Sequence, residues 1–175
     1  MRVNQEKLRG FVWKFGDNID TDQIIPSRYC NTFRPESLGP HAMEGAMPDF
    51  AKQAANGDII VAGRNFGCGS SREMAPIAIK AAGISAVVAH SFARIFYRNA
   101  VNIGLLVLIS PAASAGLVQG EDILIEPTAD ILHSLSSGRV YKCEAPDGLL
   151  KEILNEGGLV GFVKHQLEKK NSSAG

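Results

Sequence analysis

The sequence has few cysteines, no long apolar run and no excess of charge of either sign. Its three cysteines, Cys30, Cys68 and Cys143, are far apart, and the sequence has no C-x-x-C pair that would indicate a metal or cluster site. This cysteine usage fits a reducing cytoplasm. No run approaches the roughly 20 apolar residues that cross a bilayer. Eighteen basic residues balance eighteen acidic ones, which argues against nucleic acid or anionic lipid as the main ligand.

What is present is the composition of a globular protein. Apolar residues make up 45% and charged residues 21% of the 175 residues, which is the usual balance for one folded domain. Glycine is enriched, with 18 residues, and this enrichment predicts several tight loops. We expect one domain over residues 1–170 and a disordered tail over residues 171–175.

Strand and helix patterns alternate through the centre of the chain. Short apolar runs are separated by segments of helical length, which is typical of βαβ units in a largely parallel sheet. A hairpin with a turn at residues 136–138 follows near the end. The expected strands are residues 9–15, 58–62, 86–89, 105–109, 122–126, 131–135 and 140–144. The expected helices are residues 48–56, a segment ending at Gly83, residues 92–102, a short one after Pro111, and two split at residues 157–158. These patterns predict an α/β fold with a mixed sheet.

The densest candidate site is residues 63–73, GRNFGCGSSRE. It lies between a buried strand and a helix, where open α/β sheets bind ligands. Its glycines, including Gly69, let the backbone approach an anion, and the start of the next helix offers unpaired N–H groups. The segment has no lysine for a phosphate loop, no third glycine for a dinucleotide fingerprint, and no G-x-S-x-G elbow.

Ser70 and Ser71 have two interpretations. Either serine could cap the next helix, with Glu73 completing a capping box. However, Pro76 would interrupt a helix that begins at Ser70, so the regular helix could instead begin near Glu73. The two hydroxyls would then be free to face a ligand. A serine that accepts a proton needs cationic surroundings, which Arg72 and the helix dipole can supply.

Five arginines lie in or near these segments, and such a cluster in a neutral protein indicates a small acidic substrate. They are Arg28, Arg64, Arg72, Arg94 and Arg98. The acidic loop Asp17-x-x-Asp20-x-Asp22 fails the spacing of an EF-hand, and turn formation by Asp is the favoured interpretation.

Three segments together resemble a known family. Residues 16–29 (GDNIDTDQIIPSRY), residues 63–73 and residues 91–104 (SFARIFYRNAVNIG) occur in the order found in the small subunits of 3-isopropylmalate dehydratase, which match the swivelling fourth domain of aconitase. The resemblance runs from about residue 8 to residue 165. It implies a single swivelling β/β/α domain with flanking helices, which closes over a large subunit.

The resemblance also implies an activity and its residues. The activity is a hydro-lyase reaction that interconverts 2- and 3-isopropylmalate, dicarboxylate hydroxy acids, in leucine biosynthesis. The partner is a large subunit in a heterodimer or heterotetramer; it carries a 4Fe–4S cluster, and this chain binds no metal itself. Ser70 is implied as the base, Arg72 as the residue that holds the substrate, and Asp22 as a supporting acid. The expected substrate-binding residues are Arg28, Cys30, Asn31, Thr32, Arg64, Gly69 and Ser71.

Two positions depart from the family pattern. Met74 stands where the motif usually has histidine, and Cys30-Asn31-Thr32 replaces a stretch that usually begins with leucine, in a loop associated with substrate choice. The alternatives are therefore a related dehydratase, acting on homoaconitate, citraconate or dimethylmalate, and a non-catalytic anion-binding relative. Because Arg28 lies in the shared Ser-Arg-Tyr stretch and Cys30 can line an apolar pocket, we favour a substrate with a small apolar substituent.

Overall fold

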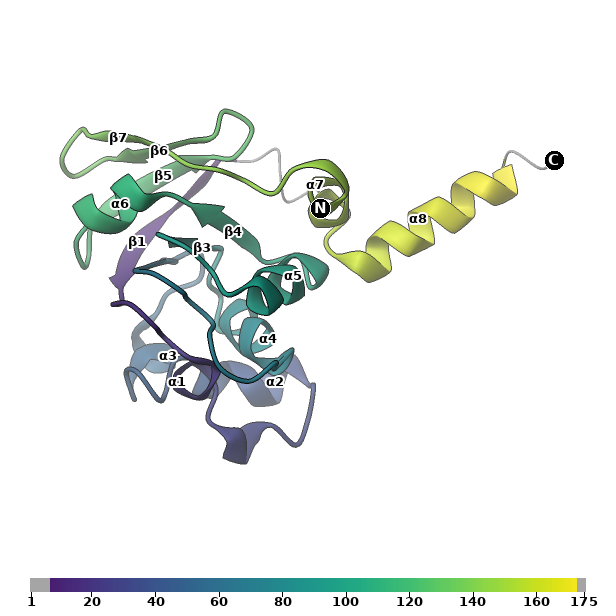
Figure 1. The fold of residues 1–175 in the computed structure, drawn as a ribbon, viewed down its shortest axis with the longest axis horizontal. Coiled ribbons are helices and arrows are strands. Elements are labelled where there is room, and N and C mark those ends of the chain that lie inside the picture. The colour runs from purple at the N-terminus through teal and green to yellow at the C-terminus, as the bar shows by residue number, and fades with distance from the viewer. Residues whose placement is uncertain (1–6, 173–175) are drawn as a thin grey trace.

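The computed structural model describes residues 7–172, and in that part of the chain one seven-stranded sheet organises the fold (Figure 1). The strand order is β4-β3-β2-β1-β5-β6-β7. The strands are β1 (Leu8–Lys14), β2 (Ile59–Ala62), β3 (Ala86–Ala89), β4 (Leu106–Ile109), β5 (Asp122–Glu126), β6 (Ile131–Ser134) and β7 (Val140–Lys142). The α/β class and the mixed sheet predicted from the sequence are confirmed.

The sheet has a parallel half and an antiparallel half. Strands β1 to β4 pair in parallel, with Val12 opposite Ile59 where β1 meets β2, whereas β5 to β7 and the β1–β5 pair are antiparallel. Every residue of β2 and β3 is buried, as expected for parallel strands covered on both faces. Residues of β5 instead alternate between buried and half-buried, which matches their alternating sequence pattern.

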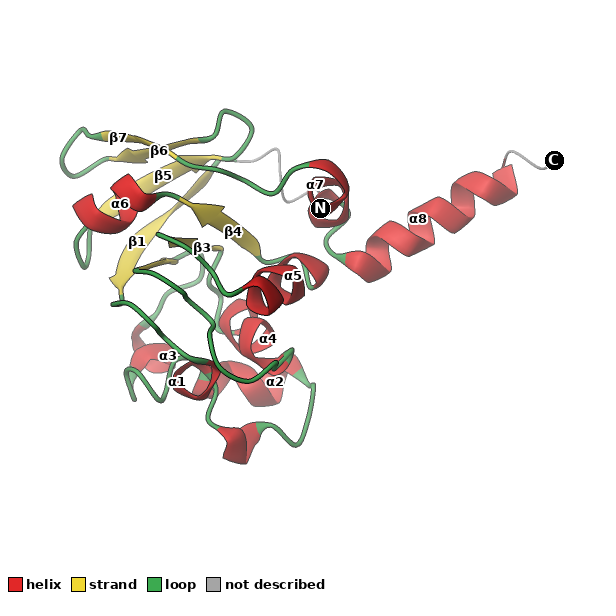
Figure 2. Cartoon of the chain, in the orientation of Figure 1, coloured by secondary structure: helices red, strands yellow, loops and turns green. Residues whose placement is uncertain are grey.

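Helices lie beside the sheet and below it in the view of Figure 2. They are α1 (Thr21–Ile24), α2 (Pro35–Leu38), α3 (Phe50–Gln53), α4 (Met74–Ala81), α5 (Arg94–Asn102), α6 (Pro111–Gly116), α7 (Gly148–Asn155) and α8 (Leu159–Ser172), with 3-10 turns η1 (Ser27–Tyr29) and η2 (Gly39–His41). Helix α6 packs against β2 and β3, and α5 packs against β4 and α4. Within the described residues, no helix has the length and apolarity needed to span a membrane.

Helix α3 is shorter than the helix predicted over residues 48–56. The buried Asp58 accounts for its early end, because its carboxylate accepts the N–H of Ala55 at 2.9 Å and also the indole N–H of Trp13 at 2.8 Å. These bonds draw the chain out of the helix at Ala54, which is extended. The carboxylate that binds Trp13 of β1 therefore also binds the backbone just after the end of the helix, a side-chain contact that periodicity does not reveal.

The C-terminal helices separate at Gly157 and Gly158, as predicted. Both glycines have positive φ values of 76° and 122°, and a Cβ on Gly158 would lie 2.5 Å from the carbonyl oxygen of Asn102. Helix α8 then extends away from the rest of the molecule (Figure 1). It continues to Ser172, so the first two residues of the predicted tail are helical, and residues 173–175 lie outside the described residues.

Candidate active site

The candidate site is built from loops that leave the carboxyl ends of parallel strands. The loop after β1 and the loop after β2 are joined by four backbone hydrogen bonds of 2.8 to 3.0 Å, from Gly63 to Gly16, Asn18 to Arg64, Gly67 to Ile19 and Thr21 to Cys68. The loop after β3 joins them, because the N–H of Ala93 donates to the Phe66 carbonyl at 2.9 Å. This edge of the sheet is where α/β folds assemble their ligand sites.

Two glycines let the loop after β2 turn close to its neighbours. Gly67 has φ of 79°, and a Cβ there would lie 2.2 Å from Cγ of Phe96 on α5. Gly69 has φ of 87°, but its nearest neighbour, Cβ of Asp20, would be 3.5 Å away. Both positions need a left-handed backbone that favours glycine. Gly67 therefore fixes the loop against α5, and Gly69 turns the chain toward Ser70.

Arg72 and Asp22 form a two-pronged ion pair at the end of this loop. Nη1 of Arg72 donates to Oδ1 of Asp22 at 2.7 Å and Nη2 donates to Oδ2 at 3.0 Å, while Nη1 also reaches the Ile25 carbonyl at 3.2 Å. The hydrogen bonds from Arg72 lower the pKa of the Asp22 carboxyl, and the same bonds raise the pKa of the guanidinium. Arg72 is 16% exposed in its side chain against 60% for Asp22. Both groups therefore stay charged at neutral pH, and Arg72 is held in a fixed orientation.

Ser70 and Arg72 line the same pocket, of about 430 Å³, between the glycine loop and the start of α5. Ser70 is exposed, and its hydroxyl makes no hydrogen bond within the described part of the chain. Its carbonyl is held instead by Oγ1 of Thr21, at 3.0 Å. The pocket is lined by Thr21, Asn65, Gly67, Gly69, Ser70, Ser71, Arg72, Ala93, Arg94, Ile95, Phe96 and Asn99.

The interpretation of Ser70 or Ser71 as a helix cap is wrong. Helix α4 begins at Met74, its N-cap residue is Glu73, and no side chain makes a cap hydrogen bond there. Pro76 accounts for the late start, since its third position in the helix requires no intrahelical N–H. Both serine hydroxyls consequently remain in the loop, on the wall of the pocket.

Turn η1 and the loop after it carry four further substrate-binding candidates, and one of them, Arg28, shares a hollow with Asp22 of the ion pair. Arg28 lines a hollow of about 400 Å³ together with Asp22, and it lines a second hollow of about 470 Å³ together with Asn31 and Thr32. Cys30 is half-buried and is not among the residues that line either hollow; its Sγ lies 3.8 Å from the Pro26 carbonyl. Burial raises the pKa of the Cys30 thiol, and the charge of nearby Arg72 opposes this shift.

The other predicted arginines differ in whether they line the Ser70 pocket. Arg94 lines the Ser70 pocket, whereas Arg64 and Arg98 are not among its lining residues. Arg64 is exposed, its N–H donates to Oδ1 of Asp17 at 2.7 Å, and its Nε lies 3.4 Å from Nε2 of His90. Arg64 is thus placed at the base of the loop rather than in the pocket with Ser70.

Sequence reasoning missed three polar residues at this site. Thr21, Asn65 and Asn99 line the pocket with Ser70, and Thr21 also supports the Ser70 backbone. Thr21 adjoins Asp22 and Asn65 lies within the glycine loop, so proximity to singled-out residues was the available signal. Asn99 has a weaker signal, since it lies on α5 between Arg94 and the end of the helix.

Cation-binding groups do not gather here. Among residues 7–172, no three His, Cys, Asp or Glu side chains come together as a set that could hold a metal ion. The cysteines Cys30, Cys68 and Cys143 are free thiols.

Comparison with known proteins gives consistent relatives. The model of the aconitase C-terminal domain matches residues 41–113. The chain is 50% identical over 167 residues to the 3-isopropylmalate dehydratase small subunit of Aquifex aeolicus, covering 95% of this chain and 99% of that one. It is 52% identical over 153 residues to the methanogen homoaconitase small subunit of Methanothermobacter thermautotrophicus, covering 87% and 88%.

A solved structure shares the whole fold. The crystal structure of a 3-isopropylmalate dehydratase from Methanocaldococcus jannaschii superposes with a TM-score of 0.93 at 45% identity, covering 96% of this chain and 99% of that one. At this identity and coverage, the two chains share the fold over nearly their whole lengths.

Proposed function

The chain belongs to the family of 3-isopropylmalate dehydratase small subunits, and from this premise we propose that it interconverts 2- and 3-isopropylmalate together with a large subunit that carries a 4Fe–4S cluster. As a member it is a subunit of an aconitase-family hydro-lyase. The observation that carries the proposal is the pocket in which Ser70, unpaired at its hydroxyl within the described residues, stands beside an Arg72 oriented by Asp22.

We assign three steps of the chemistry to this chain. Arg72 binds a carboxylate of the hydroxy acid, since a guanidinium fork matches a carboxylate in two places. Ser70, as an alkoxide stabilised by the adjacent cation, takes the proton from the carbon next to that carboxylate. The C–H electron pair forms the double bond as hydroxide leaves the neighbouring carbon. Hydroxide then adds to the carbon that lost its proton, and Ser70 returns the proton to the carbon that lost its hydroxyl, so that the two steps together add back one water.

Asp22 acts on the substrate through Arg72. Its two bonds to the guanidinium use Nη1 and Nη2, so Arg72 meets a substrate carboxylate either through Nε and the remaining N–H positions or by exchanging one Asp22 bond. A cluster held by the large subunit would supply Lewis-acid activation of the departing hydroxyl. Proton transfer by Ser70 and binding of the substrate carboxylate by Arg72 remain the contributions of this chain.

Substrate choice is proposed from Arg28. Its guanidinium already pairs with the carboxylate of Glu44, so it offers less charge to a further acidic arm of the kind homoaconitate carries. Cys30, half-buried two residues further along the chain, suits an apolar group. These contacts favour the isopropyl substituent over a carboxylate at the variable end of the substrate.

Reconstitution tests the proposal. The purified chain is assayed alone and after anaerobic mixing with the large subunit, using isopropylmalate, citraconate, dimethylmalate and homoaconitate. We expect turnover only in the mixture, with the highest kcat/KM for isopropylmalate. Turnover by the chain alone, or no turnover of any of the four acids by the mixture, would overturn the proposed function, and a preference for homoaconitate would overturn the substrate assignment.

A further inference from the structure

The carboxylate of Glu44, which lies outside the Ser70 pocket, is bonded to three other side chains. Oε1 of Glu44 accepts from the guanidinium of Arg28 and, at 3.0 Å, from the hydroxyl of Tyr29, while Oε2 lies 2.7 Å from Nδ1 of His41. Partial burial raises the pKa of Glu44, but the hydrogen bonds from His41, Tyr29 and Arg28 outweigh it and lower that pKa below its ordinary value. Glu44 is therefore an anion at neutral pH with a fixed set of partners.

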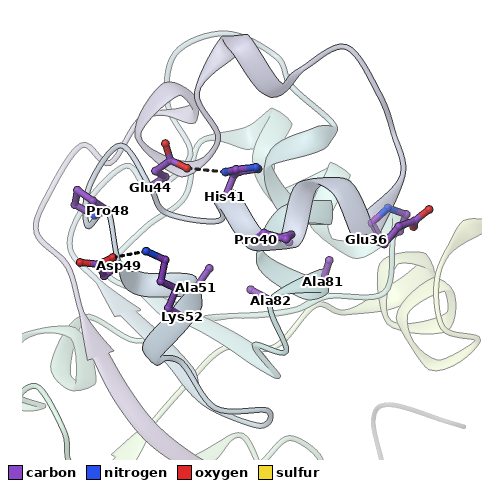
Figure 3. Close-up of a pocket in the computed structure, with 12 residues that line it drawn as sticks. Glu36, Pro40, His41, Glu44, Pro48, Asp49, Ala51, Lys52, Ala81 and Ala82 are labelled. Atoms are coloured by element: carbon purple, nitrogen blue, oxygen red, sulfur yellow. Dashed lines mark hydrogen bonds and ion pairs between the residues drawn. The ribbon is translucent and has the colours of Figure 1, made fainter.

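Glu44 lines a pocket of about 790 Å³ on the side of the molecule formed by α2, η2 and α3 (Figure 3). Figure 3 shows it pointing toward His41, while Asp49 and Lys52 form a separate ion pair of 3.0 Å on another part of the same wall. The two acids differ in their surroundings: Glu44 is 21% exposed in its side chain and Asp49 is 60% exposed. Only Glu44 reaches the Arg28 turn.

The backbone around Glu44 is fixed to the helix that carries Asp22. The N–H of Met43 donates to the Ile24 carbonyl at 2.6 Å, and the N–H of Ala46 donates to the Gln23 carbonyl at 3.2 Å. Gly45 lies so close to this helix that a Cβ would be 2.6 Å from Cα of Gln23. Glu44 therefore has a defined position relative to α1, and the side chains bonded to Glu44 are fixed relative to α1 as well.

The group it holds is the turn at Arg28 and Tyr29. The Tyr29 ring stacks on the His41 ring with centroids 3.6 Å apart, and Cζ of Arg28 lies 4.7 Å over the Tyr29 ring. On its other side this turn is bound to the active site, because the N–H of Ser27 donates to Oδ1 of Asp22 at 3.2 Å. Glu44 and Asp22 thus anchor the same turn from two directions.

We propose that Glu44 is a specificity-determining positioning residue, which neutralises and holds Arg28 so that the loop of residues 28–34 accepts an uncharged substituent and disfavours an acidic one. This inference rests on the proposed function, in which that loop faces the variable end of the substrate. With Glu44 in place, the positive charge of Arg28 is paired with the Glu44 carboxylate. When the negative charge of Glu44 is removed, Arg28 is free to pair with a carboxylate on the substrate.

The test compares two amide substitutions in the enzyme assembled with the large subunit. Glu44→Gln keeps the size of the side chain but removes the charge that holds Arg28. Asp49→Asn makes the same chemical change on the wall of the same pocket, at a pair that, within residues 7–172, makes no hydrogen bond to Arg28 or Tyr29. For each enzyme, kcat/KM is measured with isopropylmalate and with homoaconitate. The reported quantity is their ratio, which a general loss of folded or assembled protein leaves unchanged.

We expect Glu44→Gln to move this ratio toward homoaconitate by about tenfold, mainly through KM, and Asp49→Asn to move it less than about twofold. The double substitution Glu44→Gln with Arg28→Ala should abolish the shift, since Arg28 is the freed cation. An unchanged ratio in an active Glu44→Gln enzyme would overturn the inference and leave the proposed function standing. No turnover of any of the acids by the unsubstituted assembled enzyme would instead contradict the proposed function.

A second variant covers loss of folding. Glu44→Asp keeps the charge on a shorter side chain, and the inference requires a shift in the same direction but smaller than that of Glu44→Gln. If neither variant folds or assembles, Glu44 has a structural role and the specificity role is overturned.

Discussion

Replacing Ser70 with alanine separates the chemical role of this residue from a structural one. The side chain is exposed, its hydroxyl makes no hydrogen bond within residues 7–172, and helix α4 begins beyond it at Met74. Exposed substitutions without such contacts change the free energy of unfolding by about 0.5 kcal/mol or less. For a chain of this size we expect the melting temperature of Ser70→Ala to stay within about 2 °C of the original.

The same substitution should nearly abolish turnover. Removing a general base typically lowers the rate by about 10² to 10⁴, equivalent to about 3 to 5 kcal/mol of transition-state stabilisation. Because the lost interaction belongs to the transition state, kcat should fall while KM changes little. The assay is steady-state kinetics of the assembled enzyme, with the melting temperature of the isolated chain measured alongside.

Ser110→Ala is the matched control for stability. Ser110 is buried, its hydroxyl donates to the Lys142 carbonyl at 2.6 Å, and it accepts the N–H of Ala113 at 3.3 Å as the cap of α6. Its removal should cost about 1 to 3 kcal/mol with kcat retained. If Ser70→Ala instead behaved like Ser110→Ala, with lowered melting temperature and kcat within tenfold, the assignment of Ser70 as the base would be refuted.

Three further predictions concern neighbouring features. Arg72→Lys should lower kcat/KM by at least about tenfold, because an ammonium cannot make two parallel bonds to a carboxylate, and unaltered kinetics would show that charge alone suffices. Gly67→Ala should lower the free energy of unfolding, measured in urea, by about 2 to 5 kcal/mol, because alanine there meets both left-handed strain and overlap with Phe96. Gly69→Ala should lower it by about 1 to 2 kcal/mol, because it meets the strain alone. Equal losses in the two variants would contradict this difference. Cys143 is 4% exposed, and burial raises the pKa of its thiol to about 11. Only about one Cys143 thiol in a thousand is then ionised at pH 8, so this residue should resist alkylation until the chain unfolds. Rapid labelling of Cys143 in the folded chain would contradict this prediction.

Much of the sheet could be predicted because its strands have local signatures. The apolar run of β2 and the alternation of β5 are properties of a few consecutive residues, and the observed bounds agree closely with the expected ones. Helix α5 begins at Arg94, two residues later than expected, because the N–H of Ala93 is bonded to Phe66 in another loop. Helix boundaries that depend on distant partners have no local signature.

The candidate site was predictable in composition but not in arrangement. The motif around Ser70 and Arg72 indicated an anion site, and the resemblance indicated Asp22. The pairing of Arg72 with Asp22 across 50 residues, and the partners of Glu44, depend on how loops approach one another. That approach is set by contacts such as the one at Gly45, where any side chain would collide with Gln23.

The backbone bonds between the loops after β1 and β2 have a consequence for folding kinetics. A hydrogen bond from the Arg64 N–H to the Asp17 carboxylate also joins these loops across 47 positions, and Asp22 and Arg72 are 50 positions apart. Parallel strands with such separations pair slowly, because a long loop must close before any contact stabilises it. The site therefore cannot form in a nascent chain that ends before β2. During refolding, the capacity to complement a large subunit should return no earlier than the slow phase in which β1 and β2 align.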